Sequence, residues 1–150
     1  EDDVKGLVSI GSTGAVLVGS VLKIGRVKGV KRPALVSPFP TVIKGQYTTI
    51  LDIGANSVCT LEEMHQFALM GNVYHKAVFG VETPKVMTLS NGTEDHKGTP
   101  LIQDTNKLLK ESGKFALSVV GLENNPEIIK IFGSFKFFCY ICIVKFFERN

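Results

Sequence analysis

Thr88-Leu-Ser-Asn-Gly-Thr-Glu-Asp-His-Lys-Gly-Thr-Pro100 decides the fold, because this stretch joins an apolar run to a helical pattern through a loop rich in functional groups. Lys85 to Leu89 is typical of a strand, and Thr99-Pro100 is typical of a helix N-cap followed by proline in the first turn. The loop is therefore predicted between the carboxyl end of a strand and the amino end of a helix. Ligands of open α/β sheets bind at that edge, and the free N–H groups of the helix favour anions.

The composition is that of an ordinary globular domain. The 150 residues are 44% hydrophobic and 21% charged, which is enough for one sizeable core. Seventeen basic against fourteen acidic residues give a formal net charge of +3, too small to predict nucleic-acid binding. Three cysteines without a pairing pattern favour a reducing compartment, and the isolated Cys139-Tyr-Ile-Cys142 pair predicts no metal site. We expect no metal and no cofactor.

Strands and helices are expected to alternate along the chain. Apolar periodicity and turn signals predict strands at residues 4–10, 47–53, 85–89 and 115–120, and helices at 16–24, 61–79 and 100–112. Thr60-Leu-Glu-Glu63 is a capping box that places the start of the second helix. The first helix is apolar almost all round, so we expect it to be buried. His65 and His75 are expected on the surface, and the proline-rich segment 33–46 is expected to be extended and irregular.

This alternation predicts an α/β fold with a parallel sheet, right-handed crossovers and helices on both faces. The loops that carry Ser12, Asn56 and Lys97 would then meet at one edge of the sheet. Neither a P-loop nor a dinucleotide-binding glycine motif is present, so nucleotide binding is not indicated.

A run of positive charge follows the first helix. Five basic residues occur within ten positions, namely Lys23, Arg26, Lys28, Lys31 and Arg32. Such a run is usually a solvated surface. The alternative is a docking site for an acidic partner, because clustered charge steers association.

Five stretches occur in the order and spacing that characterise one protein family. They are Ile10-Gly-Ser-Thr-Gly-Ala15, Gly25-Arg-Val-Lys-Gly-Val-Lys-Arg-Pro-Ala34, Leu51-Asp-Ile-Gly-Ala-Asn56, Gln66-Phe-Ala-Leu-Met-Gly-Asn-Val-Tyr74 and Gly92-Thr-Glu-Asp-His-Lys-Gly98. Together they resemble the PlsX family of bacterial phosphate acyltransferases, over roughly residues 8–116.

The resemblance implies an enzyme of phospholipid biosynthesis that moves a fatty acyl group from acyl carrier protein to inorganic phosphate, giving acyl phosphate. It also implies a cytoplasmic homodimer loosely attached to the membrane. The implied fold is a three-layer αβα sandwich with a mainly parallel sheet, like that of phosphotransacetylases and isopropylmalate dehydrogenases, of which this chain would hold an incomplete part.

The implied chemistry requires positioning and positive charge, because phosphate is the nucleophile and a thioester is already activated. Lys97 is the expected catalytic residue, with an exposed loop lysine as the alternative. Asp52 and Glu94 are expected to orient it or nearby N–H groups. The expected substrate-binding residues, several of which could equally cap helices or turns, are Ser12, Thr13, Gly14, Asn56, Thr93 and Gly98.

Several departures from the family pattern bear on activity. Ser12 stands where the family usually has asparagine, and the family's glycine- and aspartate-rich amino-terminal motif and later aspartate-glycine-phenylalanine motif are absent. We expect residues 1–130 to be the central part of a family domain and 131–150 to be an aberrant apolar tail, with a buried strand or helix as the alternative for the tail. The alternative function is an inactive acyl-carrier-binding fragment or a non-functional gene product.

Overall fold

The computed structural model describes residues 6–41, 43–113, 116–121 and 142–145, the last two ranges as backbone only. It divides the chain into two units, Glu1–Pro33 and Ala34–Asn150, and we treat each by itself.

The first unit contains one helix, α1 (Thr13–Lys23), among its described residues. Ser12 caps it, because its hydroxyl accepts a hydrogen bond from the Ala15 amide at 3.4 Å. Residues 6–10 form no strand, so the predicted first strand is wrong over that range. The expectation of a buried helix is also wrong, since no residue of α1 is buried and Leu22 is 77% exposed. The described residues of this unit, 6–33, include no strand on which α1 could pack its apolar side chains.

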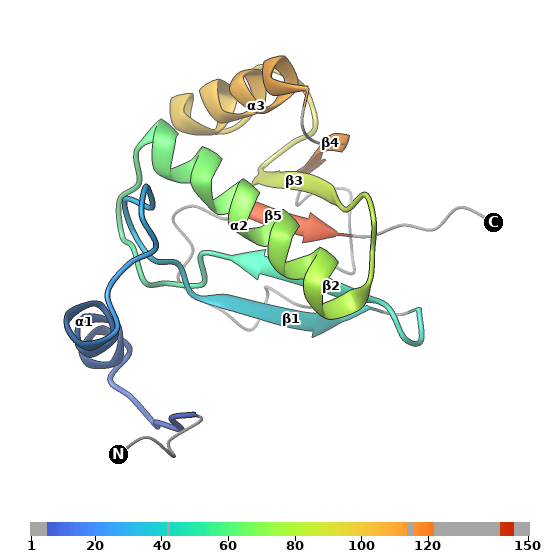
Figure 1. Ribbon diagram of the computed structural model, residues 1–150. Helices are drawn as coiled ribbons and strands as arrows, with labels where there is room; N and C mark the ends of the chain where they lie inside the picture. Colours follow the sequence, from blue (N-terminus) through green and yellow to red (C-terminus); the bar gives the residue numbers. More distant parts are fainter. Residues whose placement is uncertain (1–5, 42, 114–115, 122–141, 146–150) are drawn as a thin grey trace. The chain divides into compact units, whose positions relative to one another are not determined.

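The second unit is built on a five-stranded sheet with the order β1-β2-β5-β3-β4 (Figure 1). Its strands are β1 (Val36–Pro40), β2 (Tyr47–Leu51), β3 (Lys85–Ser90), β4 (Ala116–Gly121) and β5 (Cys142–Lys145). The β3–β4 pair is parallel, whereas the β1–β2, β2–β5 and β3–β5 pairs are antiparallel. The sheet is therefore mixed, which corrects the expectation of a parallel sheet. Because β2 and β3 are both antiparallel to β5, the strands β2, β3 and β4 still run in one direction.

The proline-rich segment is extended as expected, but its residues Val36–Pro40 form the regular strand β1, which corrects the expectation that it is irregular. Val36 pairs with Leu51 and Pro40 with Tyr47, and the exposed residues alternate along the strand. Proline lacks an N–H group, so it fits a strand only where that group would point away from the partner strand. Pro38 and Pro40 are two residues apart and so face the same side, which makes an edge position compatible with both.

Helices α2 (Leu61–Phe79) and α3 (Pro100–Ser112) confirm the two best-defined sequence predictions. The capping box is formed, with the Thr60 amide donating to Glu63 Oε2 at 2.7 Å. Both helices end at a glycine with positive φ, Gly80 and Gly113. The helices contact each other and lie over one face of the sheet (Figure 1). A helical layer on the other face stays a prediction.

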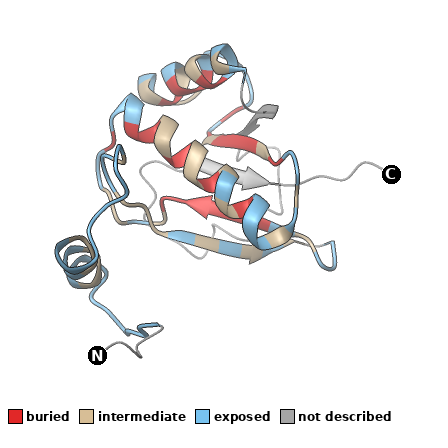
Figure 2. Cartoon of the chain, in the orientation of Figure 1, coloured by how far each residue is buried: buried red, intermediate tan, exposed pale blue. Residues whose placement is uncertain are grey.

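The core lies between these helices and the sheet (Figure 2). Its buried members include Leu51 from β2, Phe67 from α2, Val86 from β3, and Ile102 and Leu109 from α3. Each buried side chain of this size contributes about 1.5–3 kcal/mol relative to an exposed one. This core fixes the strand ends from which the candidate site loops emerge.

His75 is buried, contrary to the sequence expectation, with 1% of its surface exposed. Its Nδ1 lies 2.8 Å from Thr49 Oγ1, and its ring centroid is 4.8 Å from that of Phe79. The buried stripe of α2 runs through Met64, Ala68, Gly71 and His75 at helical spacing, so His75 occupies a core position. The hydroxyl of Thr49 supplies the polar partner that burial requires.

Strand β5 falls inside residues 131–150, of which the structure describes 142–145 only. It lies between β2 and β3. Cys139 of the Cys-x-x-Cys pair lies outside the described residues, so the expectation about this pair stays a prediction. The nature of this tail stays a prediction.

Candidate functional site

Two of the three predicted loops leave the sheet at the same edge. Leu51 at the end of β2 and Thr88 near the end of β3 both pair with Cys142 of β5. Two strand spacings separate β2 from β3, so these ends are about 10 Å apart. The Asn56 and Lys97 loops therefore begin close together. Ser12 belongs to the first unit, and its meeting with these loops stays a prediction.

The loop after β2 is organised by the buried carboxylate of Asp52. Oδ1 accepts hydrogen bonds from the amides of Leu35 at 2.8 Å and Ala55 at 3.1 Å. Oδ2 accepts from the Asn56 amide at 2.7 Å and from Asn56 Nδ2 at 2.9 Å. Four charge-assisted bonds satisfy this buried carboxylate and fix the side chain of Asn56. The same bonds occupy the amides of Ala55 and Asn56.

The loop after β3 turns tightly around Lys97. The Lys97 amide donates to the Glu94 carbonyl at 2.9 Å, and the Gly98 amide donates to Asn91 Oδ1 at 2.9 Å. Gly98 has φ +90°, a conformation that glycine adopts without strain. A Cβ at position 98 would lie 2.8 Å from Ser90 Oγ, so glycine is also required for space.

The side chain of Lys97 is half-buried and its stem lies over Gly92. A Cβ on Gly92 would meet Glu94 Oε2 at 2.6 Å and Lys97 Cγ at 2.9 Å, which places both side chains over that glycine. The backbone hydrogen bond of Glu94, helped by the nearby charge of Lys97, lowers the pKa of the Glu94 carboxyl. Among the described residues, Lys97 forms no ion pair with a carboxylate.

The loop leads directly into the amino end of α3. Thr99 is the N-cap, accepting from the Ile102 amide at 3.4 Å, and Pro100 occupies the first turn as predicted. Gln103 reaches back from this turn and donates from Nε2 to the carbonyls of His96 at 2.9 Å and Gly98 at 3.1 Å. Sequence reasoning missed Gln103 and Asn91. An amide side chain beside a glycine-bounded loop was the signal that could have identified them.

The remaining predicted ligands lie in simpler surroundings. Thr13 and Gly14 are the first two residues of α1, following the cap made by Ser12. Thr93 is exposed. Asp95 pairs with Lys110 at 2.9 Å, and this hydrogen bond lowers the pKa of Asp95.

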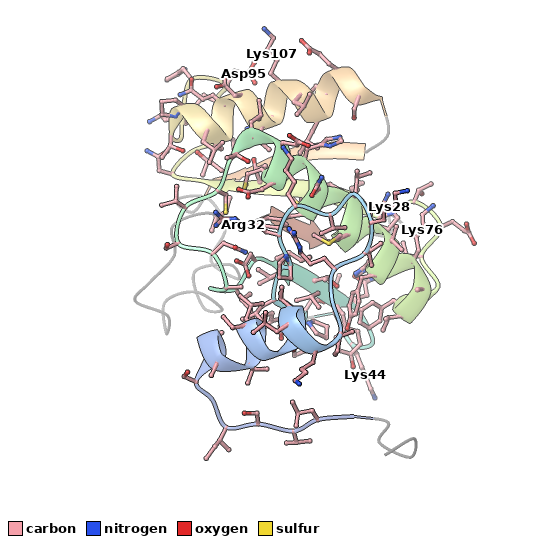
Figure 3. The ribbon with its side chains drawn as sticks, turned by 60° about the vertical axis from the view of Figure 1, so that its left-hand side comes forward. Lys28, Arg32, Lys44, Lys76, Asp95 and Lys107 are labelled. Carbon is pink, nitrogen blue, oxygen red and sulfur yellow. The ribbon has the colours of Figure 1, made fainter. Side chains whose placement is uncertain are left out.

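All five residues of the basic run are exposed. The Arg26 guanidinium donates to the Lys31 carbonyl, and a turn places the Val30 amide 3.0 Å from the Val27 carbonyl. Figure 3 labels Lys28 and Arg32 of this run. The run thus begins at the last residue of α1 and continues in the loop that follows, which we call the basic loop, and a docking role for it stays a prediction.

Three further features bear on the type of site. An open hollow of about 470 Å³ lies beside α3, with Asp95, Gln103 and Lys107 among its lining, but Lys97 is not part of that lining. Figure 3 labels Asp95 and Lys107. Among the side chains that the structure describes, no group of three or more His, Cys, Asp or Glu residues could hold a metal ion. No helix in the described part of the chain combines the length and apolarity needed to span a bilayer.

Comparison with known proteins places these features in a family context. The family model described as "Fatty acid synthesis protein" matches residues 1–130. Phosphate acyltransferase of Dictyoglomus turgidum is 46% identical over 130 residues, which are 87% of this chain and 38% of that protein. The enzyme of the same name from Synechocystis sp. is 42% identical over 128 residues, covering 85% and 33% of the two chains. That of Helicobacter hepaticus is 48% identical over 119 residues, covering 79% and 35%. The chain thus spans about a third of the length of these relatives.

Proposed function

This chain belongs to the family of fatty acid synthesis proteins that includes these phosphate acyltransferases, and from that premise we propose that it binds inorganic phosphate beside Lys97 for acyl transfer. The acyl donor in this proposal is a fatty acyl thioester of acyl carrier protein, and the product is acyl phosphate for phospholipid biosynthesis. The names of the relatives state only phosphate acyl transfer. The acyl donor and the product are what we propose in addition.

The observation that carries the proposal is the position of Lys97. Its half-buried side chain sits on a glycine-bounded turn that ends at the N-cap of a 13-residue helix. The helix dipole and the ammonium charge both favour an anion there. A phosphate dianion would be stabilised by both, because each places positive charge near its oxygens.

The reaction needs one bond made and one broken. A phosphate oxygen attacks the thioester carbonyl carbon, and the resulting tetrahedral oxyanion collapses with cleavage of the C–S bond. The sulfur leaves with the electron pair and takes up a proton as the carrier's thiol. In this scheme Lys97 stabilises the phosphate charge and the oxyanion, and removing one such stabiliser typically costs 10²–10³ in turnover.

The other residues have supporting roles in the proposal. Asn56, held by Asp52, would contact phosphate or the acyl carbonyl from the neighbouring loop. Glu94 would orient Lys97, to which its carboxylate is close. Further donors to phosphate oxygens would come from the hydroxyls of Thr93, Ser12 and Thr13, with Gly14 and Gly98 allowing close approach of the backbone.

The proposed partner surface is the basic loop of the first unit. Acyl carrier proteins are acidic as a class, so the five exposed basic residues would steer the donor by charge. By family resemblance, we also propose that the protein forms a homodimer and makes peripheral contact with the cytoplasmic membrane. The alternative proposal is carrier binding without acyl transfer.

The test combines a phosphate titration with an assay for acyl phosphate. Phosphate binding to Lys97→Ala should be at least tenfold weaker than to the wild type, whereas Lys107→Ala, on the outer side of α3, should bind normally. Acyl phosphate formed from acyl carrier protein thioester would support the enzyme. Carrier binding without product would support the alternative, and equal phosphate binding by both variants would refute a role for Lys97.

A further inference from the structure

We propose that Gln103 is a positioning residue that clamps the backbone on both sides of Lys97. Its side-chain amide donates to the carbonyl of His96 at 2.9 Å and to the carbonyl of Gly98 at 3.1 Å. A primary amide has two N–H donors, so one side chain can satisfy both acceptors. The opposite orientation of the amide would bring its oxygen against two carbonyl oxygens, so only this orientation is compatible with the loop.

Helix α3 holds Gln103 in a fixed position. Its own amide donates to the Thr99 carbonyl at 3.1 Å, a backbone bond at the start of α3. On either side of Gln103, Ile102 and Leu109 anchor the helix in the core. A side chain on a packed helix fixes its target more firmly than one on a loop.

The clamp completes a set of restraints on the lysine. The peptide unit between His96 and Lys97 is bonded at both ends, because its N–H reaches the Glu94 carbonyl and its C=O accepts from Gln103. The next N–H, that of Gly98, is held by Asn91. These bonds set the direction in which the Lys97 side chain leaves the backbone.

The functional consequence rests on the proposed phosphate site. An ammonium group on a flexible stem must be ordered when it binds an anion, and pre-ordering of its backbone reduces that entropic cost. Gln103 therefore strengthens phosphate binding without touching phosphate. It differs in this from Lys97, which would contact the ligand.

Two variants of the full 150-residue chain test the clamp. Gln103→Glu keeps the shape of the side chain but sets oxygens against both carbonyls, and Gln103→Leu removes the donors without adding charge. Lys107→Gln is the matched control, because it lowers the net charge by one, as Gln103→Glu does, at an exposed position of the same helix. Amide hydrogen exchange and titration with inorganic phosphate are measured on each.

In both Gln103 variants, the backbone amide hydrogens of Lys97 and Gly98 should exchange with solvent about tenfold faster. This factor corresponds to the loss of roughly one net hydrogen bond. Exchange at Leu109, in the middle of the core face, should not change, and phosphate should bind about tenfold more weakly. Lys107→Gln should match the wild type in both measurements.

Unchanged exchange at Lys97 and Gly98 in both variants would overturn the clamp, whatever happens to phosphate binding. Faster exchange with unchanged phosphate affinity would overturn the positioning role. A wild-type chain that binds no phosphate would overturn the proposed function and the positioning role together, and the exchange data would still show whether Gln103 holds the loop.

Discussion

Replacing Gly98 with alanine should destabilise the loop that carries Lys97, and the structure separates two causes. The first is conformational, because Gly98 has φ +90° and an L-residue with positive φ costs about 1–2 kcal/mol. The second is steric, because the added Cβ would lie 2.8 Å from Ser90 Oγ and 3.1 Å from Ile102 Cγ2. Overpacking of this kind typically costs a further ~1–3 kcal/mol.

The magnitude follows by comparison with Gly113, which ends the same helix. Gly113 also has positive φ, +61°, but a Cβ there would meet nothing within 4 Å. Gly113→Ala should therefore lose only the conformational term, about 1–2 kcal/mol of unfolding free energy. Gly98→Ala should lose about 2–5 kcal/mol, the sum of the two terms.

Urea unfolding of the two variants measures this difference through the transition midpoint. Adding Ser90→Ala to Gly98→Ala should recover part of the loss, because it removes the atom in closest contact. Equal destabilisation by Gly98→Ala and Gly113→Ala, with no recovery from Ser90→Ala, would refute the tight packing of this loop.

Three further predictions concern buried charge, the buried histidine and the basic loop. Asp52→Asn should lower the unfolding free energy by about 3 kcal/mol or more, because it sets an NH₂ group against N–H donors. The control Asp104→Asn, at an exposed position, should change it little. Equal effects of the two substitutions in urea unfolding would contradict this. Burial lowers the pKa of His75 below 6.5, so the unfolded state binds the proton more readily and stability should fall as pH drops through 6.5. His75→Gln should flatten that dependence, and an unchanged slope in urea melts would oppose it. Charge reversal at Lys28 or Lys31 should weaken acyl carrier protein binding, which should itself decline with salt; salt-independent affinity would exclude the docking role.

Local signals explain why two helices were predicted correctly. The capping box at Thr60 and the Thr99-Pro100 start both act within one turn, and Gly113 ends α3 through its own backbone conformation. Such signals are readable because every interacting partner lies within a few residues. The bounds of these elements therefore followed from the sequence.

Strand partners could not be read in the same way. From the sequence alone, Pro38 and Pro40 indicate irregular structure. They become compatible with a strand only once β1 is known to pair, among the described residues, on one side only, with β2. The placement of β5 between β2 and β3 joins residues 54 or more positions apart in sequence, since Thr88 pairs with Cys142, and no local pattern specifies it. The apolar residues of α1 predicted burial, but its unit contains no described strand to cover them.

The candidate site shows the same division. The Lys97 loop and its glycines were recognisable from the sequence, because the polar residues and glycines of the loop directly precede the residues that start the helix. The burial of His75 depends on Thr49, which lies 26 positions earlier, and the clamp from Gln103 depends on how the loop folds back. These contacts required the three-dimensional arrangement.

Titration of the full chain with inorganic phosphate, for the wild type and Lys97→Ala side by side, tests the central claim most directly. Saturable binding that Lys97→Ala weakens at least tenfold, and that Lys107→Ala leaves unchanged, is the result we predict. In a turnover assay the same Lys97 variant should lose roughly a hundredfold or more. Wild-type protein that folds cooperatively but binds phosphate no better than Lys97→Ala would contradict the account.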